Sequence, residues 1–353
     1  MVRLLLYRSV VLLLVLNFIS TSCSLTGRQV IPTPTPLIAS RILKNAQGFP
    51  WKERWRLTAH LLQSYENVRN LITTDGGVIF TDNPTGREDV LKLVSANDGS
   101  QQWAIELDGW IDSIVRDENL VYVVGNAGRV LEAYHLWTGD LAWKSKLILP
   151  DHSGYNQRLQ GSQLQIYSSR ERDLIYIIDP STGDLADTIR ISPISQESAA
   201  LLKLENGDTL QANQTQLMLV RNGTVVWQTN LEGAPQKFPS VVGNMLVVRF
   251  KNDRTVFDGL AGLDLATGRL IWQRPAEFLS NFAVANDLLY IVSKEASVFI
   301  IDPQTGKTIG EIETLPKTIN TFYPISAVAV NDHMLYVYFF DSQELIAFER
   351  MAD

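Results

Sequence analysis

Residues 263–272 read Leu263-Asp264-Leu265-Ala266-Thr267-Gly268-Arg269-Leu270-Ile271-Trp272. An apolar run leads into a polar turn that ends in glycine, and a tryptophan follows four positions after that glycine. A hairpin loop of this length usually ends in a residue with left-handed backbone, which glycine adopts without a steric cost. The stretch therefore predicts two antiparallel strands joined by a tight turn.

The same pattern repeats along the chain. The turn glycines are Gly99, Gly139, Gly183, Gly223, Gly268 and Gly306, and they are spaced by 40, 44, 40, 45 and 38 residues. A period in this range, with several short apolar runs in each unit, is typical of the four-stranded blade of a β-propeller. We therefore predict an all-β propeller with units over 67–109, 110–147, 148–191, 192–234, 235–276 and 277–315.

An aromatic residue at a fixed place accompanies most of these glycines. The residues four positions after a turn glycine are Trp103, Trp143, Trp227 and Trp272 in four units, and Asp187 and Gly310 in the other two. We expect the tryptophans on the outermost strand of each blade. From there they would pack into the seam between blades, because only a neighbouring blade can cover the apolar faces of radially arranged sheets.

Each end of the chain carries an incomplete unit. Residues 51–61 predict one strand, with Trp55 in the aromatic place, and residues 334–340 and 345–348 predict two strands. We predict that the N-terminal strand completes the last blade, which would close the ring and remove exposed sheet edges. Six full units and this composite unit give a seven-bladed propeller, and eight blades are the alternative.

The N-terminal residues predict export. In residues 1–22, Arg3 and Arg8 precede an apolar core, residues 10–16, that is too short to span a membrane. Cys23 follows at once and is the only cysteine of the chain. Its position resembles a bacterial lipoprotein signal, in which this cysteine is lipidated and becomes the mature N-terminus, although Ser20 stands where that family prefers Leu. An ordinary secretory signal cleaved near Ser22 is the alternative.

The segment after the signal predicts a spacer. Residues 23–50 include Pro32-Thr33-Pro34-Thr35-Pro36, and alternating proline favours an extended, semi-rigid chain that cannot pack a core. We therefore predict three parts: a signal peptide (1–22), a lipidated cysteine with a tether (23–50) and the propeller (51–353).

The composition limits the function classes. The chain is 45% hydrophobic and 9% aromatic, which is enough for a buried core, and its formal net charge is −7. Removal of Arg3 and Arg8 with the predicted signal makes the remainder more acidic. An acidic domain without a basic run argues against binding to nucleic acid or to an anionic lipid surface.

The turn pattern Asp-x-x-Thr-Gly followed by Trp resembles the PQQ-like (pyrroloquinoline-quinone type) propeller repeat. Residues 264–272 are the cleanest match, and 179–183 and 302–306 match at the turn. The resemblance covers roughly residues 51–353 and implies the propeller fold. It implies two kinds of function: quinoprotein dehydrogenases, and non-catalytic propellers such as the lipoprotein subunit of the outer-membrane β-barrel assembly machinery.

The residues favour the non-catalytic kind. Many quinoprotein dehydrogenases carry adjacent cysteines over the cofactor, and this chain has one cysteine. Its four histidines, His60, His135, His152 and His333, are scattered and show no spacing typical of a zinc site. We therefore expect no cofactor, no metal and no catalytic residues.

We expect a monomeric scaffold, exported and anchored on the outer side of the cell membrane or on the periplasmic side of the outer membrane. It would present loops to a protein or glycan partner in the envelope. The longest insertions are the expected contacts: Thr81–Asp89, Pro150–Arg158 and Phe250–Gly259. A quinoprotein-type oxidoreductase and a small-ligand sensor that uses the axial channel are the alternatives. Trp110 and Trp137 lie outside the repeat pattern, and either line a ligand surface or add to the packing of the core or of a seam between blades.

Overall fold

The computed structural model describes residues 51–61, 71–83, 86, 89–107, 109–126, 129–150, 155–168, 174–190, 199–236, 239–251, 258–314 and 326–351. All of them belong to one compact unit, Thr33–Asp353. No α-helix occurs in these ranges, and thus none of the length and apolar character needed to cross a membrane. The predicted all-β class is confirmed.

Four sheets are separate, antiparallel and four-stranded, with their strands in chain order. The first holds β2 (Leu71–Thr73), β3 (Gly77–Asp82), β4 (Val90–Ser95) and β5 (Gln101–Glu106). The second holds β6 (Ile111–Arg116), β7 (Leu120–Gly125), β8 (Val130–His135) and β9 (Leu141–Lys144). The third holds β10 (Tyr155–Gln160), β11 (Gln163–Ser168), β12 (Leu174–Ile178) and β13 (Leu185–Arg190). The fourth holds β14 (Ala199–Lys203), β15 (Thr209–Asn213), β16 (Gln216–Arg221) and β17 (Thr224–Asn230).

The remaining strands form one larger sheet, because β22 (Leu270–Ala285) belongs to two antiparallel groups and also pairs in parallel, at Ser280↔Ser326, with the first strand of the last group. The first part of β22 pairs with β21 (Asp258–Asp264), which pairs with β20 (Met245–Lys251); β20 in turn pairs with β18 (Ala234–Pro235) and β19 (Ser240–Val242). The last part of β22 pairs with β23 (Leu288–Ser293), and β24 (Ser297–Ile301) and β25 (Thr308–Glu313) follow.

The last group joins the two ends of the chain. It holds β26 (Ser326–Val330), β27 (Met334–Phe339), β28 (Glu344–Arg350) and β1 (Trp51–Thr58). β1 pairs antiparallel with β28 from Trp51↔Arg350 to Thr58↔Glu344, with a bulge between Glu53 and Trp55. The prediction that the N-terminal strand completes the C-terminal sheet is confirmed.

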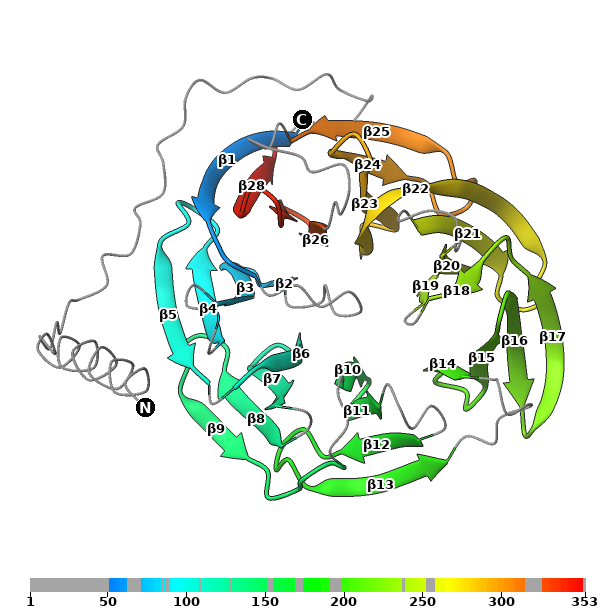
Figure 1. Cartoon of the computed structure of the whole chain (residues 1–353), viewed down its shortest axis with the longest axis horizontal. Helices are drawn as coiled ribbons and strands as arrows, with labels where there is room; N and C mark the ends of the chain where they lie inside the picture. The colour runs from blue at the N-terminus through cyan, green and yellow to red at the C-terminus, as the bar shows by residue number, and fades with distance from the viewer. Residues whose placement is uncertain are drawn as a thin grey trace, which may run out of the picture. The chain divides into compact units, whose positions relative to one another are not determined.

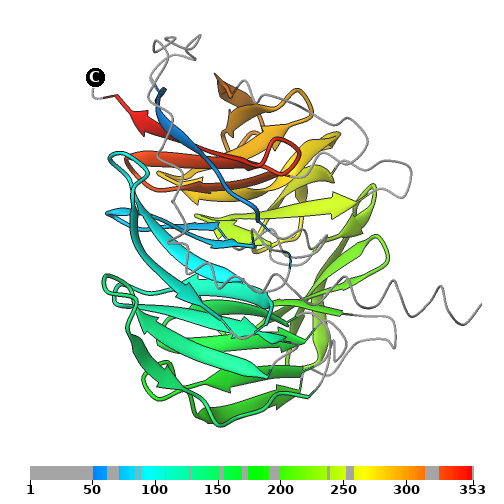
Figure 2. The same cartoon turned by 60° about the vertical axis from the view of Figure 1, so that its left-hand side comes forward.

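The sheets stand side by side around a central axis, and β1 lies beside β28 where the circle closes (Figure 1). Figure 2 shows the stacked sheets from another side. This arrangement confirms the propeller. The described strands fall into seven antiparallel groups; the number of blades of the whole protein stays a prediction. We call each group a blade and name it by its strands.

The core lies between the blades. For example, Val78 and Phe80 of the β2–β5 blade pack with Tyr336 and Ala347 of the β26–β28/β1 blade, and all four are almost fully buried. Successive side chains of a strand point to opposite faces, so that the buried strands of each blade contribute side chains to both neighbouring blades.

Strand direction gives the ring two different ends. Within a blade, the first and third connections lie at one end, which we call the turn face. The second connection, and the link to the next blade, lie at the other end, which we call the loop face. The turn-face connections span two to six residues, whereas residues 59–70, 145–154 and 314–325 connect strands on the loop face. The long connections therefore emerge at the loop face.

Candidate functional site

Each predicted turn glycine lies on the turn face, between the last two strands of a blade. Gly268 has a φ of +70°, and its N–H donates to the carbonyl oxygen of Asp264 at 2.8 Å. Asp264 Oδ1 accepts hydrogen bonds from the N–H and the hydroxyl of Thr267, at 2.8 and 2.7 Å. These two bonds explain why Asp and Thr accompany the glycine at these spacings.

The tryptophan of the preceding blade packs on this turn. The ring of Trp227, on β17, lies so close to Gly268 that a methyl group built on the glycine would be 2.3 Å from Cδ2 of the ring. Trp227 Nε1 donates to the carbonyl oxygen of Leu265 at 3.0 Å. The glycine is therefore required for two reasons: the left-handed backbone of the turn, and the space that the indole ring occupies.

Five seams share this geometry, which we call tryptophan docking. In each, the indole N–H donates to the carbonyl of the residue three positions before the glycine, and the ring lies against that glycine. The donors and acceptors are Trp55 and Ala96 (2.9 Å), Trp103 and Leu136 (3.0 Å), Trp143 and Pro180 (2.8 Å), Trp227 and Leu265 (3.0 Å), and Trp272 and Pro303 (2.7 Å). The glycines are Gly99, Gly139, Gly183, Gly268 and Gly306.

Two positions depart from this geometry. Gly223 has no atom within 4 Å of the place where its Cβ would be, and the unit before it carries Asp187, which is exposed. Gly310 occupies the aromatic place in β25, and the blade after it is the composite one. The third and fourth strands of the composite blade, β28 and β1, are not connected by a turn, because they come from opposite ends of the chain. An indole at position 310 would therefore find no turn in which to dock.

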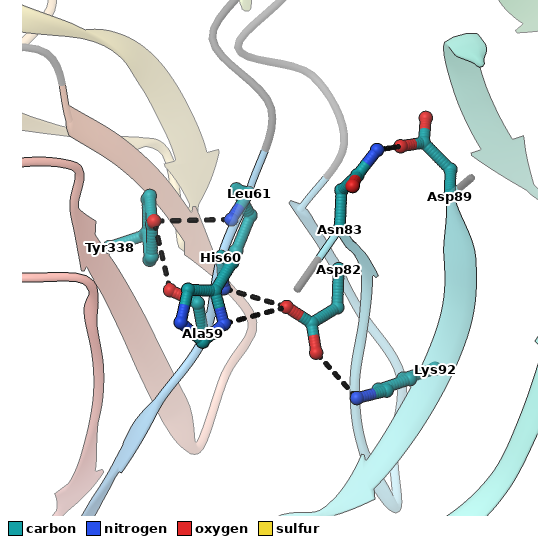
Figure 3. A network of polar contacts seen from close by, with 8 residues as sticks. All are labelled: Ala59, His60, Leu61, Asp82, Asn83, Asp89, Lys92 and Tyr338. Atoms are coloured by element: carbon teal, nitrogen blue, oxygen red, sulfur yellow. Dashed lines mark hydrogen bonds and ion pairs between the residues drawn. The ribbon is translucent and has the colours of Figure 1, made fainter. Parts of the chain in front are cut away.

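A network of polar contacts lies at the loop face, where the chain leaves β1 (Figure 3). The buried carboxylate of Asp82, at the end of β3, accepts the backbone N–H of His60 at 2.7 Å, and His60 Nδ1 is 3.6 Å from the same oxygen. Lys92 Nζ, on β4, lies 2.5 Å from the other carboxylate oxygen. Asp82 thus ties the exit of β1 to the β2–β5 blade.

The network extends to both neighbouring blades. Tyr338, on β27, accepts the N–H of Leu61 at 3.1 Å, and its hydroxyl donates to the carbonyl of Ala59 at 3.0 Å. On the other side, Asp89 accepts from Asn83 Nδ2 at 2.8 Å and from the N–H of Ile111 at 2.6 Å. Burial raises the pKa of Asp89, and these two hydrogen bonds lower it in part. The polar chain therefore joins three consecutive blades across the point where the ring closes.

The two most exposed large apolar side chains of the described residues are at the loop face. Ile148 is 71% exposed and Trp110 62% exposed, and each lies in a connection between consecutive blades. Trp137 is 51% exposed and lies on the turn face, where its ring covers Gly76 of the preceding blade. Trp137 thus packs across a seam, in line with the packing interpretation, whereas Trp110 is not buried in the core. Exposure follows from their places in connections, which the repeat pattern leaves unspecified.

The three predicted insertions all belong to the loop face, but they are shorter than predicted. Thr81 and Asp82 are the end of β3, Tyr155–Arg158 lies in β10, and Phe250, Lys251, Asp258 and Gly259 lie in β20 and β21. Residues 84, 85, 87, 88, 151–154 and 252–257 lie outside the described residues, as do the predicted signal, Cys23 and the tether.

The charged groups show no clustering typical of a metal centre. His60, His135 and His333 lie in different parts of the ring, and His152 lies outside the described residues. Within the described ranges, no group of three His, Cys, Asp or Glu side chains is placed to hold an ion.

The sequence matches one protein family over most of its length. Residues 51–192 and 171–352 match the family described as outer membrane protein assembly factor BamB. The chain is 21% identical over 273 residues to BamB of Moranella endobia (strain PCIT), which covers 69% of this chain and 66% of that protein. It is 23% identical over 246 residues to BamB of Salmonella typhimurium, covering 63% of this chain and 61% of that protein. The chain thus spans slightly less than two thirds of these relatives.

A solved structure has the same fold. The crystal structure of BamB from Moraxella catarrhalis superposes with a TM-score of 0.52 at 12% sequence identity, covering 88% of this chain and all of that one. The repeat pattern, the ring and these matches agree. The chain belongs to the PQQ-like propeller family described as outer membrane protein assembly factor BamB.

Proposed function

We propose that this protein is a non-catalytic scaffold of the bacterial cell envelope, anchored by a lipid on Cys23, and that its loop face binds a protein of outer-membrane assembly. Its relatives are named as outer membrane protein assembly factors. The observation that carries the proposal is the contrast between the two ends of the ring.

The loop face has the features of a protein-binding surface. It bears the long connections, and it presents Trp110 and Ile148 at 62% and 71% exposure. Tryptophan is enriched at the centres of protein interfaces, where it contributes most when water is excluded. Behind this face, the hydrogen bonds of Asp82 and Asp89 hold the starting points of the connections in fixed positions.

The turn face is less suited to a partner. Its connections are short, and five of its turns are already occupied by docked tryptophans. The described chain also enters the ring here, because Trp51, the first residue of β1, pairs with Arg350 at this end. A tether that joins the ring at the turn face leaves the loop face open.

Affinity capture of the full chain from membranes solubilised in mild detergent tests this proposal. We expect an outer-membrane assembly protein to be recovered in stoichiometric amount. The double variant Trp110→Ala/Ile148→Ala should recover at least tenfold less of it. The matched control, Trp137→Ala, removes an exposed tryptophan from the turn face and should recover as much as the parent chain. Equal recovery by both variants would place the contact elsewhere, and recovery of the chain alone would contradict the scaffold.

The anchor has a separate test. Substitution Cys23→Ser should abolish lipid attachment, seen as the loss of the lipid mass, and should move the protein from the membrane to the soluble fraction. Unchanged mass and membrane partition would show that the anchor lies elsewhere and leave the loop-face proposal standing.

The quinoprotein alternative is tested by adding the quinone with calcium to the purified protein and recording its absorbance and dye reduction. The adjacent cysteines that many quinoprotein dehydrogenases carry are absent from this sequence, and no acidic cluster that could hold calcium occurs among the described residues. We expect neither a bound chromophore nor turnover. Turnover of an alcohol or sugar would contradict the non-catalytic proposal.

A further inference from the structure

The seam between the β10–β13 blade and the β14–β17 blade differs from the others in its turn. In the five seams with tryptophan docking, the carbonyl that accepts the indole N–H belongs to a residue just after the end of a strand, as Leu265 lies just after β21. Here the turn is only Asn222-Gly223, with φ of 50° and 77°. The residue three positions before the glycine is Val220, inside β16 and paired with Val225. A tryptophan ring from the preceding blade would therefore contact a paired strand at this seam, whereas in the five seams with tryptophan docking it contacts a turn.

The aromatic partner is missing from the same seam. Asp187 of β13 stands where four other units carry tryptophan, and β13 is exposed along nearly its whole length. This seam therefore lacks both parts of tryptophan docking: the indole on one blade and the longer turn on the other.

The hydrophobic packing among the described residues is also weaker at this seam. In the described residues, apolar clusters cross each of the other six seams. The β10–β13 blade has apolar side chains that face this seam, but they form a cluster within their own blade. They are Tyr167, Ile175, Ile177 and Ile189. No cluster of described residues joins this blade to the β14–β17 blade.

Polar groups take the place of apolar ones on the inner strand. Tyr155 and Leu159 of β10 pack toward the preceding blade, and Gln157 donates to the carbonyls of Ser113 and Tyr122 there. Because side chains alternate, Asn156 and Arg158 face the β14–β17 blade.

These two polar side chains are poorly matched across the seam. Asn156 is 1% exposed, and its Oδ1 has no hydrogen-bond partner. Burial lowers the pKa of Arg158, and attraction to Tyr167 and Glu205 offsets this in part. A buried unpaired acceptor and a partly buried, weakly paired cation cost stability and weaken the contact between the blades.

Absence of a docked tryptophan alone does not make a seam weak. The seam before the composite blade also lacks one, because Gly310 stands in that place. There, however, Asn281 exchanges two hydrogen bonds with Val328, at 3.3 and 3.2 Å, and a cluster that includes Tyr290, Leu335 and Phe348 crosses the seam. The combination of no docking, no shared cluster and buried polar groups is found only between β10–β13 and β14–β17 in the described structure.

We propose that the ring opens reversibly at this seam, so that the two blades separate as rigid units while the rest of the ring stays closed. No described strand is shared between the two sheets, so opening breaks no strand pairing. The seam is a built-in hinge, at a place distinct from the junction of the chain ends.

Thiol labelling under native conditions tests the hinge in the full chain with Cys23→Ser, so that the introduced cysteine is the only one. Ile177 and Ile178 are neighbours on β12 and are 3% and 0% exposed, but Ile177 faces the hinge seam and Ile178 the docked one. We expect Ile177→Cys to react at least tenfold faster than Ile178→Cys. The labelling rate of Ile177→Cys should also depend only weakly on the urea concentration, because opening a seam exposes less surface than global unfolding does.

A second pair makes the same test from the other side. Met218 and Leu219 of β16 are both 4% exposed, and Leu219 packs toward the β18–β22 blade while Met218 points the other way. Met218→Cys should label faster than Leu219→Cys by a similar factor. The free energy of unfolding of each variant, measured in urea, is used to correct its labelling rate for any difference in global stability. If the corrected labelling rates and their dependence on urea were equal within either pair, the hinge proposal would be wrong.

Discussion

At the scale of single residues, docked tryptophans join neighbouring blades at five seams, each by an indole hydrogen bond and by contact with a glycine. Truncation of Trp227 to alanine removes both and leaves a cavity, so we expect a loss of about 3–5 kcal/mol in the free energy of unfolding. Asp187→Ala changes the equivalent position of another unit, where nothing docks, and should change stability by less than about 0.5 kcal/mol. Urea unfolding of the two variants gives the comparison. Similar losses would show that the repeat position, and not docking, matters.

The aspartates of the turns make stability depend on pH. The hydroxyl and N–H of Thr267 bind the carboxylate of Asp264 and hold its pKa below the ordinary value of 3.8. A carboxyl whose pKa is lowered by folding stabilises the protein above its unfolded pKa, and this contribution disappears as the pH falls through the folded pKa. Asp264→Asn should therefore be less stable than the parent near neutral pH. The difference should shrink in acid, as thermal unfolding at a series of pH values would show; a constant difference would contradict this account.

At the scale of elements, β1 is the outer strand of a blade whose other three strands come from the opposite end of the chain. A chain that begins at Trp51 should fold, whereas a chain that begins after Thr58 leaves β28 as an open edge and also loses Trp55 and its docking to the β2–β5 blade. We expect the shorter chain to aggregate or dimerise on size exclusion and to lose its cooperative thermal transition. A monomeric, cooperatively folding short chain would show that β1 is dispensable.

The elements that the sequence predicted best are those with a strict local pattern. The glycine turns follow from Asp264, Thr267 and Gly268 because their bonds lie within a few residues, and the incomplete ends pointed to the pairing of β1 with β28. The start of β10 was missed, and Tyr155–Arg158 was assigned to an insertion, because Asn156, Gln157 and Arg158 lack the apolar alternation of a strand.

The contacts of the loop face could not be predicted in the same way. Asp82, Asn83 and Asp89 are residue types that favour turns, and their partners His60, Ile111 and Lys92 lie in three different segments. Lys92 reaches Asp82 across one pair of neighbouring strands, but His60 and Ile111 come from the two adjacent blades and meet these carboxylates only in the assembled ring. Of the long connections, the sequence located only part of residues 145–154, through the predicted insertion Pro150–Arg158, and the strand directions place all of them on one face.

At the scale of the whole molecule, the ring combines a turn face fixed by docked tryptophans with a loop face that carries the long connections. Two places in the circle depart from the repeat: the composite blade, where strand pairing between the chain ends replaces a turn, and the seam between β13 and β14, where docking is lost. The first closes the ring and the second is our proposed hinge. Because the loop face spans both places, opening of the hinge would change the spacing of the connections that we propose bind a partner.

Closure by β1 and β28 is tested most directly by a cross-link between the strands, in the full chain with Cys23→Ser. Lys52 and Glu349 are direct partners in the register, so Lys52→Cys/Glu349→Cys should form an intramolecular disulfide under mild oxidation. Mass spectrometry would find it as one linked peptide pair, and the bond should stabilise the protein by about 2–4 kcal/mol. In the control Lys52→Cys/Arg350→Cys, the second side chain points to the opposite face of its strand and should not react. Cross-links only between molecules, or equal reaction in both pairs, would contradict the closed ring.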